Sequence, residues 1–69
     1  MKIAARNVLK GRIKRVVHGL VSSEVTIEVN GGVEIVSSIN KSVAEQLGLA
    51  PEREAYGIIQ ATDVMIALD

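Results

Sequence analysis

The chain has 69 residues, a formal net charge of zero from 8 basic and 8 acidic residues, and no cysteine. A chain of this length is expected to form one domain, over residues 1–69, with a small core that needs help from disulfides, metals or oligomerisation. The missing cysteines exclude disulfides and thiolate metal sites, and the single histidine excludes a multi-histidine site within one chain. Because 48% of the residues are hydrophobic and mean hydropathy is +0.30, the composition predicts a homo-oligomer with apolar interfaces.

The same composition argues against several kinds of partner and activity. Nucleic-acid-binding proteins usually carry a basic excess and several aromatic residues, whereas this chain is neutral and has only Tyr56. No apolar run approaches the length of a membrane span and no signal peptide is evident, so the cytoplasm is the expected location. No nucleophile–base pair and no nucleotide-binding glycine motif stands out. We therefore expect no enzyme, no nucleic-acid partner and no membrane partner.

Alternating residues predict a first strand over Asn7–Val17. Apolar residues and Gly11 occupy one face, and basic residues occupy the other. Gly11 indicates a bend or a close approach of two backbones. The doublet Val16-Val17 breaks the alternation, which indicates a bulge or a strand buried on both faces. His18-Gly19 is typical of a turn.

A hairpin is predicted next. Ser22–Val29 alternates cleanly, and Val33–Ile39 continues as the returning strand. Asn30-Gly31-Gly32 lies between them, and both residue types tolerate the positive φ of hairpin turns.

A short helix and two more strands complete the predicted order. Either Asn40 or Ser42 suits the N-cap of a helix that ends at Gly48. Alternation predicts strands over Glu54–Ile59 and Thr62–Leu68. The order β-β-β-α-β-β is that of an all-β protein, an OB-type five-stranded Greek-key barrel with one short helix.

Small residues and neutral hydrogen-bond donors gather at the predicted strand ends. They form the segments Ala4-Ala5-Arg6-Asn7, Asn40-Lys41-Ser42-Val43 and Gln60-Ala61-Thr62. Small side chains leave backbone N–H groups accessible, a helix start carries partial positive charge, and Arg6 adds a forked cation. This combination suits a small anion with several oxygens. Ordinary capping and turn chemistry accounts for the same residues, and on the residues alone it is the commoner explanation.

Two terminal motifs carry a family resemblance. The opening Ala4-Ala5-Arg6-Asn7-Val8-Leu9-Lys10-Gly11 is similar to S-A-R-N-x-L-K-G, and the segment from Ala55 to Ile66 is similar to A-Y-A-x-I-K-A-T-D-V-M-I. The hairpin from Gly31 to Ile39 and the helix from Ser42 to Leu49 continue the similarity. These motifs belong to the molbindins, the small Mop-like molybdate-binding proteins, and the chain resembles them nearly end to end.

The molbindin resemblance implies a fold, a ligand and an assembly. The implied fold is an OB-type barrel that assembles into a homohexamer, a trimer of dimers. The implied ligand is molybdate or tungstate, bound at subunit interfaces in more than one kind of site, with no organic cofactor and no direct cation ligands. The implied role is cytoplasmic storage of the oxyanion. A ligand-free structural or regulatory module of the same family is the alternative.

Carried over residue by residue, the resemblance places the main oxyanion site at Ala4, Ala5, Arg6, Asn40, Ser42, Val43, Gln60 and Ala61. Three of these positions depart from the family pattern. Family members have a serine at Ala4, threonine or serine at Asn40, and lysine at Gln60. The missing lysine charge predicts either weaker binding or a different oxyanion, and the sequence does not separate molybdate from tungstate.

A second oxyanion site is expected at the turn that contains His18, Gly19, Val21 and Ser22. The turn offers backbone N–H groups and hydroxyls, and a symmetry axis would repeat each donor in every subunit. A solvated hairpin turn explains the same residues at least as well.

Overall fold

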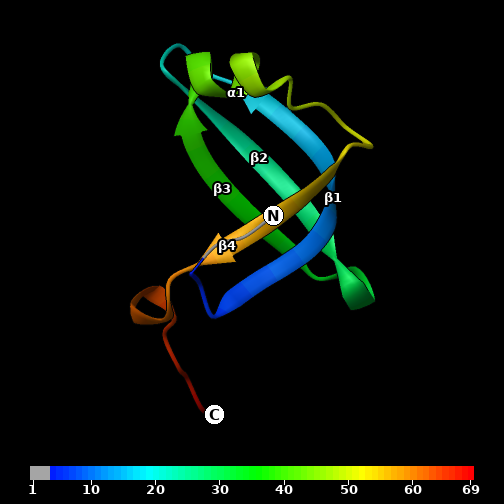
Figure 1. Ribbon diagram of the computed structural model, residues 1–69. Helices are drawn as coiled ribbons and strands as arrows, with labels where there is room; N and C mark the ends of the chain where they lie inside the picture. Colours follow the sequence, from blue (N-terminus) through cyan, green and yellow to red (C-terminus); the bar gives the residue numbers. More distant parts are fainter. Residues whose placement is uncertain (1–3) are drawn as a thin grey trace.

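The structure is a computed structural model and describes residues 4–69. Four antiparallel strands form one curled sheet in the order β3-β2-β1-β4, and a single short α-helix follows β3 (Figure 1). The elements are β1 (Asn7–His18), β2 (Ser22–Val29), β3 (Glu34–Asn40), α1 (Lys41–Leu47) and β4 (Glu54–Ile59). The predicted all-β class with one short helix is confirmed, and the observed elements follow the predicted order up to and including β4.

Strand β1 connects the two halves of the sheet. Its first half pairs with β4 and its second half pairs with β2, and both partners pair with Gly11 and Arg12. The register shifts between Ile13 and Arg15, so that Lys14 is the extra residue of a bulge. The bulge therefore lies shortly before Val16-Val17, the doublet from which the sequence predicts a bulge. Such a bulge bends a strand, which fits the strong curl of β1 in Figure 1.

Gly11 lies where β1 and β2 approach closely, as the sequence predicts. A Cβ atom at this position would lie 2.5 Å from the carbonyl oxygen of Glu28 and 2.7 Å from Cγ2 of Ile27. No side chain fits into that space without moving the neighbouring strand. Glycine at this position thus permits the strand contact that encloses the core.

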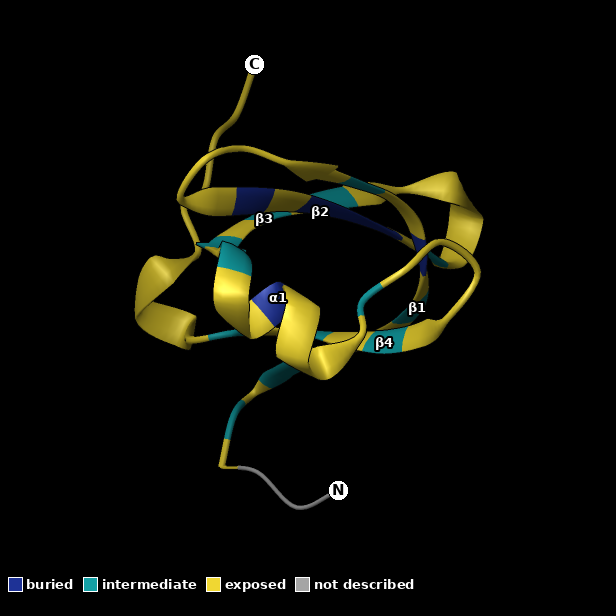
Figure 2. Ribbon diagram, turned by 90° about the horizontal axis from the view of Figure 1, so that it is seen from above, coloured by how far each residue is buried: buried dark blue, intermediate teal, exposed yellow. Residues whose placement is uncertain are grey.

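The core is small and lies on the concave face of the sheet. Ile13, Val25 and Ile27 are at most 7% exposed, and half-buried apolar residues pack against them. Ala44 of α1 is 1% exposed, and Figure 2 shows α1 lying over one open end of the ring that the strands form. Burial on this scale stabilises a domain only marginally, which keeps the expectation of oligomerisation in place.

Both ends of α1 are capped. The side-chain oxygen of Asn40 accepts hydrogen bonds from the N–H of Ser42 at 2.9 Å and from its hydroxyl at 2.6 Å. Asn40 rather than Ser42 is therefore the N-cap. At the other end Gly48 takes the left-handed conformation with φ of 65°, and Arg53 donates to the carbonyls of Leu47 and Gly48. Within residues 4–69 no helix is long and apolar enough to cross a membrane.

The predicted fifth strand over Thr62–Leu68 is wrong for the single chain. Ala61–Asp63 forms one turn of 3-10 helix, and no strand is present from residue 64 to residue 69. Met65, Ile66 and Leu68 are between 85% and 94% exposed. Alternation shows that a segment is suited to pairing, but it does not show that the same chain supplies a partner strand. Residues 64–69 are called the C-terminal tail below.

A substitution at Gly11 tests the close approach of β1 and β2. We expect Gly11→Ala to lower the free energy of unfolding by about 1–3 kcal/mol, because the added methyl group meets the backbone of β2. Gly57→Ala is the matched control, since a Cβ there would have its nearest neighbours at 3.9 Å. Urea denaturation measures both. Equal stability of the two variants would contradict the packing described for β1.

Candidate functional site

The pairing of β1 with β4 brings the two ends of the chain together. Asn7 pairs with Ile59 at the end of the ladder, and the side-chain amide of Asn7 donates to the carbonyl of Ile59 at 3.1 Å. The residues before β1 and after β4 therefore lie side by side (Figure 1). They line a cavity of about 350 Å³, which is called the terminal cavity here. Its lining residues are Ala4, Ala5, Arg6, Gln60, Ala61 and Thr62.

The described residues that line the terminal cavity offer hydrogen-bond donors and one positive charge. Arg6 supplies a guanidinium, Gln60 a carboxamide and Thr62 a hydroxyl, while alanines leave the backbone accessible. Among the residues that the structure describes, no carboxylate lines this cavity and no carboxylate forms an ion pair with Arg6. An oxygen-rich anion is the ligand that such a surface favours.

The 3-10 turn after β4 fixes the shape of this cavity. The N–H of Asp63 donates to the carbonyl of Gln60 at 2.9 Å, and the N–H of Val64 donates to that of Ala61 at 3.4 Å. These bonds hold Gln60 and Ala61 beside the segment that precedes β1. The carboxylate of Asp63 follows directly in the chain but does not line the cavity.

Three predicted residues of the main site lie elsewhere in the chain. Asn40, Ser42 and Val43 belong to the start of α1, at the end of the sheet opposite the terminal cavity (Figure 1). The single chain thus brings together five of the eight predicted residues, namely Ala4, Ala5, Arg6, Gln60 and Ala61. A site that contains all eight needs a second copy of the chain.

The predicted second site lies beside the start of α1. The carbonyl of Val21 accepts a hydrogen bond from the N–H of Lys41, and the N–H of Gly19 donates to the carbonyl of Ser22, both at 2.8 Å. His18 Nδ1 lies 2.6 Å from the hydroxyl oxygen of the fully buried Ser23. The Gly19 N–H and one imidazole nitrogen are therefore already engaged within the turn.

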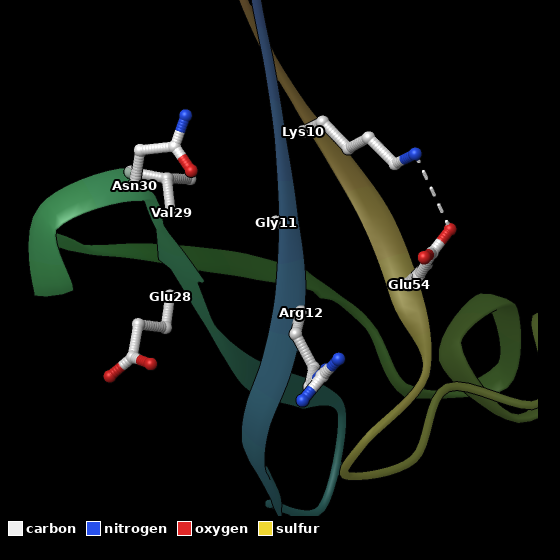
Figure 3. A pocket seen from close by; sticks show the side chains of 7 residues that line it. All are labelled: Lys10, Gly11, Arg12, Glu28, Val29, Asn30 and Glu54. Carbon is white, nitrogen blue, oxygen red and sulfur yellow. Dashed lines mark ion pairs between the residues drawn. The ribbon is translucent and has the colours of Figure 1, made fainter.

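A second hollow of about 350 Å³ lies over β1, β2 and β4 and is lined by both signs of charge (Figure 3). Lys10 lies 3.7 Å from Glu54, and Arg12 lies 3.7 Å from Glu52. Glu28 adds another carboxylate to the lining. Because its cations already have carboxylate neighbours, this hollow is less suited to a dianion than the terminal cavity.

The perturbed ionisable groups lie on the outer face of the sheet. A hydrogen bond from Lys14 lowers the pKa of the Glu34 carboxyl, and the same bond raises the pKa of Lys14. Arg15, which follows the bulge residue Lys14, also donates to Glu34, at 3.1 Å. These exposed pairs belong to the sheet surface. Within residues 4–69 no cluster of histidine, aspartate or glutamate is arranged to hold a metal ion.

Thr62 is the lining residue that the predicted site omits. The sequence Gln60-Ala61-Thr62 stands out as a group of small residues and donors, but Thr62 is placed at the start of the predicted strand over Thr62–Leu68 and not in the predicted site. In the structure Thr62 lies instead in the 3-10 turn, and it is one of the residues that line the cavity. Its hydroxyl directly follows two predicted ligand residues in the sequence, and this is the signal from which Thr62 could have been included in the site.

The comparisons with known proteins agree with the terminal motifs. The sequence model of the TOBE domain matches residues 3–66. Molybdenum-pterin-binding protein 3 of Clostridium pasteurianum is 44% identical over 66 residues, which cover 96% of this chain and 97% of that protein. The chain belongs to the TOBE domain family, among its small Mop-type members. The molbindin resemblance is thereby confirmed.

Solved structures of Mop-type TOBE proteins share the fold along nearly the whole chain. MopII from Clostridium pasteurianum has a TM-score of 0.92 and 39% identity, with 97% of this chain and 100% of that chain covered. A molybdate-binding protein from Sporomusa ovata has a TM-score of 0.90 and 28% identity, with 99% and 100% covered. The similarity of structure confirms the OB-type class, although this chain has four strands rather than the five predicted.

Proposed function

We propose that this protein binds molybdate, or the similarly shaped tungstate, in the terminal cavity and stores it in the cytoplasm. The observation that carries the proposal is the cavity itself, where Arg6 and neutral donors meet with no carboxylate among the lining residues. Membership of the Mop-type TOBE proteins supports molybdate as the ligand, because relatives are molybdate-binding proteins. Small, neutral or cationic lining groups are suited to an anion, and no aromatic residue lines the cavity to stack on a pterin.

A dianion in the terminal cavity calls for more charge or donors than the described lining residues of one chain offer. A dianion that leaves water needs compensating charge or many donors, and Arg6 is the one cation among the described residues that line the cavity. Gln60 contributes amide hydrogens but no charge. We propose that the start of α1 from a second copy, with Asn40, Ser42 and Val43, completes each site at a subunit boundary. The proposed assembly is the homohexamer, a trimer of dimers.

The exposed apolar residues support this assembly. Leu20 is 98% exposed, and the C-terminal tail exposes Met65, Ile66 and Leu68 to a similar extent. Apolar side chains this exposed, three of them within one short segment, are typical of surfaces that another chain covers. The sheet also leaves β3 and β4 as edges that can pair with another strand. We propose that the tail packs as a strand against a second copy of the chain.

A ligand-free structural or regulatory module is the second candidate function. It is favoured by Ala4 and Gln60, which lack the hydroxyl and the positive charge that the molbindin pattern has at these positions. In that case the same assembly forms, but the terminal cavity holds no ion at physiological concentrations.

Ion binding by the purified protein separates these candidates. We expect native mass spectrometry and calorimetry to show molybdate or tungstate on the oligomer and to show exclusion of sulfate and phosphate. Arg6→Gln is expected to lower the affinity about tenfold or more, because a charge-assisted hydrogen bond is lost. Arg12→Gln is the control, since Arg12 lies in the hollow with mixed charge. An oligomer that binds no oxyanion would support the ligand-free module.

The number of ions bound per oligomer tests the second site. If the turn that contains His18 and Ser22 binds oxyanions about a symmetry axis, His18→Ala and Ser22→Ala lower the stoichiometry and leave the terminal cavities filled. Ser38→Ala removes an exposed hydroxyl from β3 and serves as the control. Unchanged stoichiometry in the first two variants rejects this site.

Charged substitutions in the tail test the assembly. We expect Ile66→Glu to shift the protein toward the 7.4 kDa monomer in sedimentation, because burial of a carboxylate in an apolar contact is costly. In the proposed strand, residue 67 points to the side opposite residue 66, so Ala67→Glu is expected to disturb the assembly less. A wild-type protein that sediments as a 7.4 kDa species would refute the proposed oligomer.

A further inference from the structure

Thr62 is the one residue with a side-chain hydroxyl among the described residues that line the terminal cavity. The other lining groups are one guanidinium, one carboxamide and the methyl groups of alanines. Thr62 as a residue is exposed to solvent. Neither the predicted site nor the family match assigns a role to this side chain.

The local structure does not use this hydroxyl. The 3-10 turn is held by backbone bonds from Asp63 and Val64, and its N-cap residue Gln60 makes no side-chain capping bond. Among residues 4–69, the Thr62 hydroxyl makes no hydrogen bond to another protein group. By contrast, the hydroxyls of Ser42 and Ser23 both have side-chain partners. Within residues 4–69, the Thr62 hydroxyl is therefore not engaged by a protein partner.

The charge in the cavity makes an additional donor valuable. Arg6 alone cannot balance a dianion, and Gln60 offers donors without charge. A hydrogen bond to a charged acceptor is stronger than one between neutral groups. A short threonine side chain also loses little conformational freedom when it is fixed, because its β-branch restricts χ1.

We propose that Thr62 is a ligand-binding residue, whose hydroxyl donates a hydrogen bond to an oxygen of a fully deprotonated tetrahedral oxyanion in the terminal cavity. This inference rests on the proposed function, because it concerns the same cavity and the same ligand. With Thr62, the cavity combines one cation, one amide and one hydroxyl on three side chains. Gln60 and Thr62 both come from the segment after β4, and Arg6 comes from the segment before β1.

Removal of the hydroxyl at constant shape tests the proposal. Thr62→Val replaces the hydroxyl by a methyl group, and we expect its affinity for molybdate to fall about tenfold or more, as for the loss of a hydrogen bond to a charged group. Thr62→Ser keeps the hydroxyl and is expected to stay within a few-fold of wild type. Ser38→Ala is the control for loss of an exposed hydroxyl outside the cavity. Calorimetric titration with sodium molybdate measures all four proteins at one pH and salt concentration.

The outcomes separate this inference from the proposed function. If wild type binds molybdate and Thr62→Val binds equally well, the inference is overturned and the function stands. If wild type binds no molybdate, the proposed function itself fails and the inference fails with it. Native mass spectrometry and thermal unfolding check that Thr62→Val keeps its assembly and stability. If Thr62→Val does not assemble, Thr62→Ala replaces it as the variant without the hydroxyl. If Thr62→Ser then binds molybdate as weakly as Thr62→Ala, the methyl group rather than the hydroxyl matters, and the inference is overturned.

Discussion

The contact between the first residue of β1 and the last residue of β4 is the one on which the candidate site depends. Asn7 and Ile59 pair across the ladder, and the Asn7 side chain adds a bond to the Ile59 carbonyl. A contact between residues so distant in sequence is costly in chain entropy and must be supported by packing. That support comes from the close approach at Gly11 and the core around Ile13. The fold thereby converts two terminal segments into one surface.

The fold places the polar residues of the predicted main site in two separate groups, although the molbindin resemblance assigns them to one site. The terminal cavity lies at one end of the curled sheet, while α1 and the turn after β1 lie at the other. Such a distribution has a physical consequence for a multi-subunit protein. In the proposed assembly, an anion between two copies would contact the terminal cavity of one copy and the start of α1 of the other. Each chain could then supply both kinds of contact, to two different sites. Exposed apolar residues at the helix end and in the tail are suited to hold these ends together.

The sequence predicts most elements because their signals are local. The alternation over Ser22–Val29, the cap residue Asn40 and the close approach at Gly11 all depend on neighbours in the chain or on one residue's size. The bulge at Lys14 and the missing strand after Thr62 depend on partners far away in sequence, which alternation does not encode. The residues of the candidate site divide in the same way, into those with a local signal and those whose place depends on the fold. Arg6 and Gln60 stand out as residues, whereas the place of Thr62 follows from the turn that β4 ends in.

The neutral carboxamide of Gln60 gives the terminal cavity its electrostatic character. A lysine at this position would add a second cation, and the attraction for any anion would rise with little regard to its geometry. With Arg6 as the one cation among its described lining residues, the cavity would hold an anion more through hydrogen bonds, whose strength falls steeply with poor alignment. Directional donors discriminate between oxyanions by the position of their oxygens and by their protonation, because a donor cannot serve a protonated oxygen well. In the proposed site, glutamine in place of lysine would exchange part of the long-range attraction for geometric selection, and the affinity would then depend on how many donors a neighbouring copy brings.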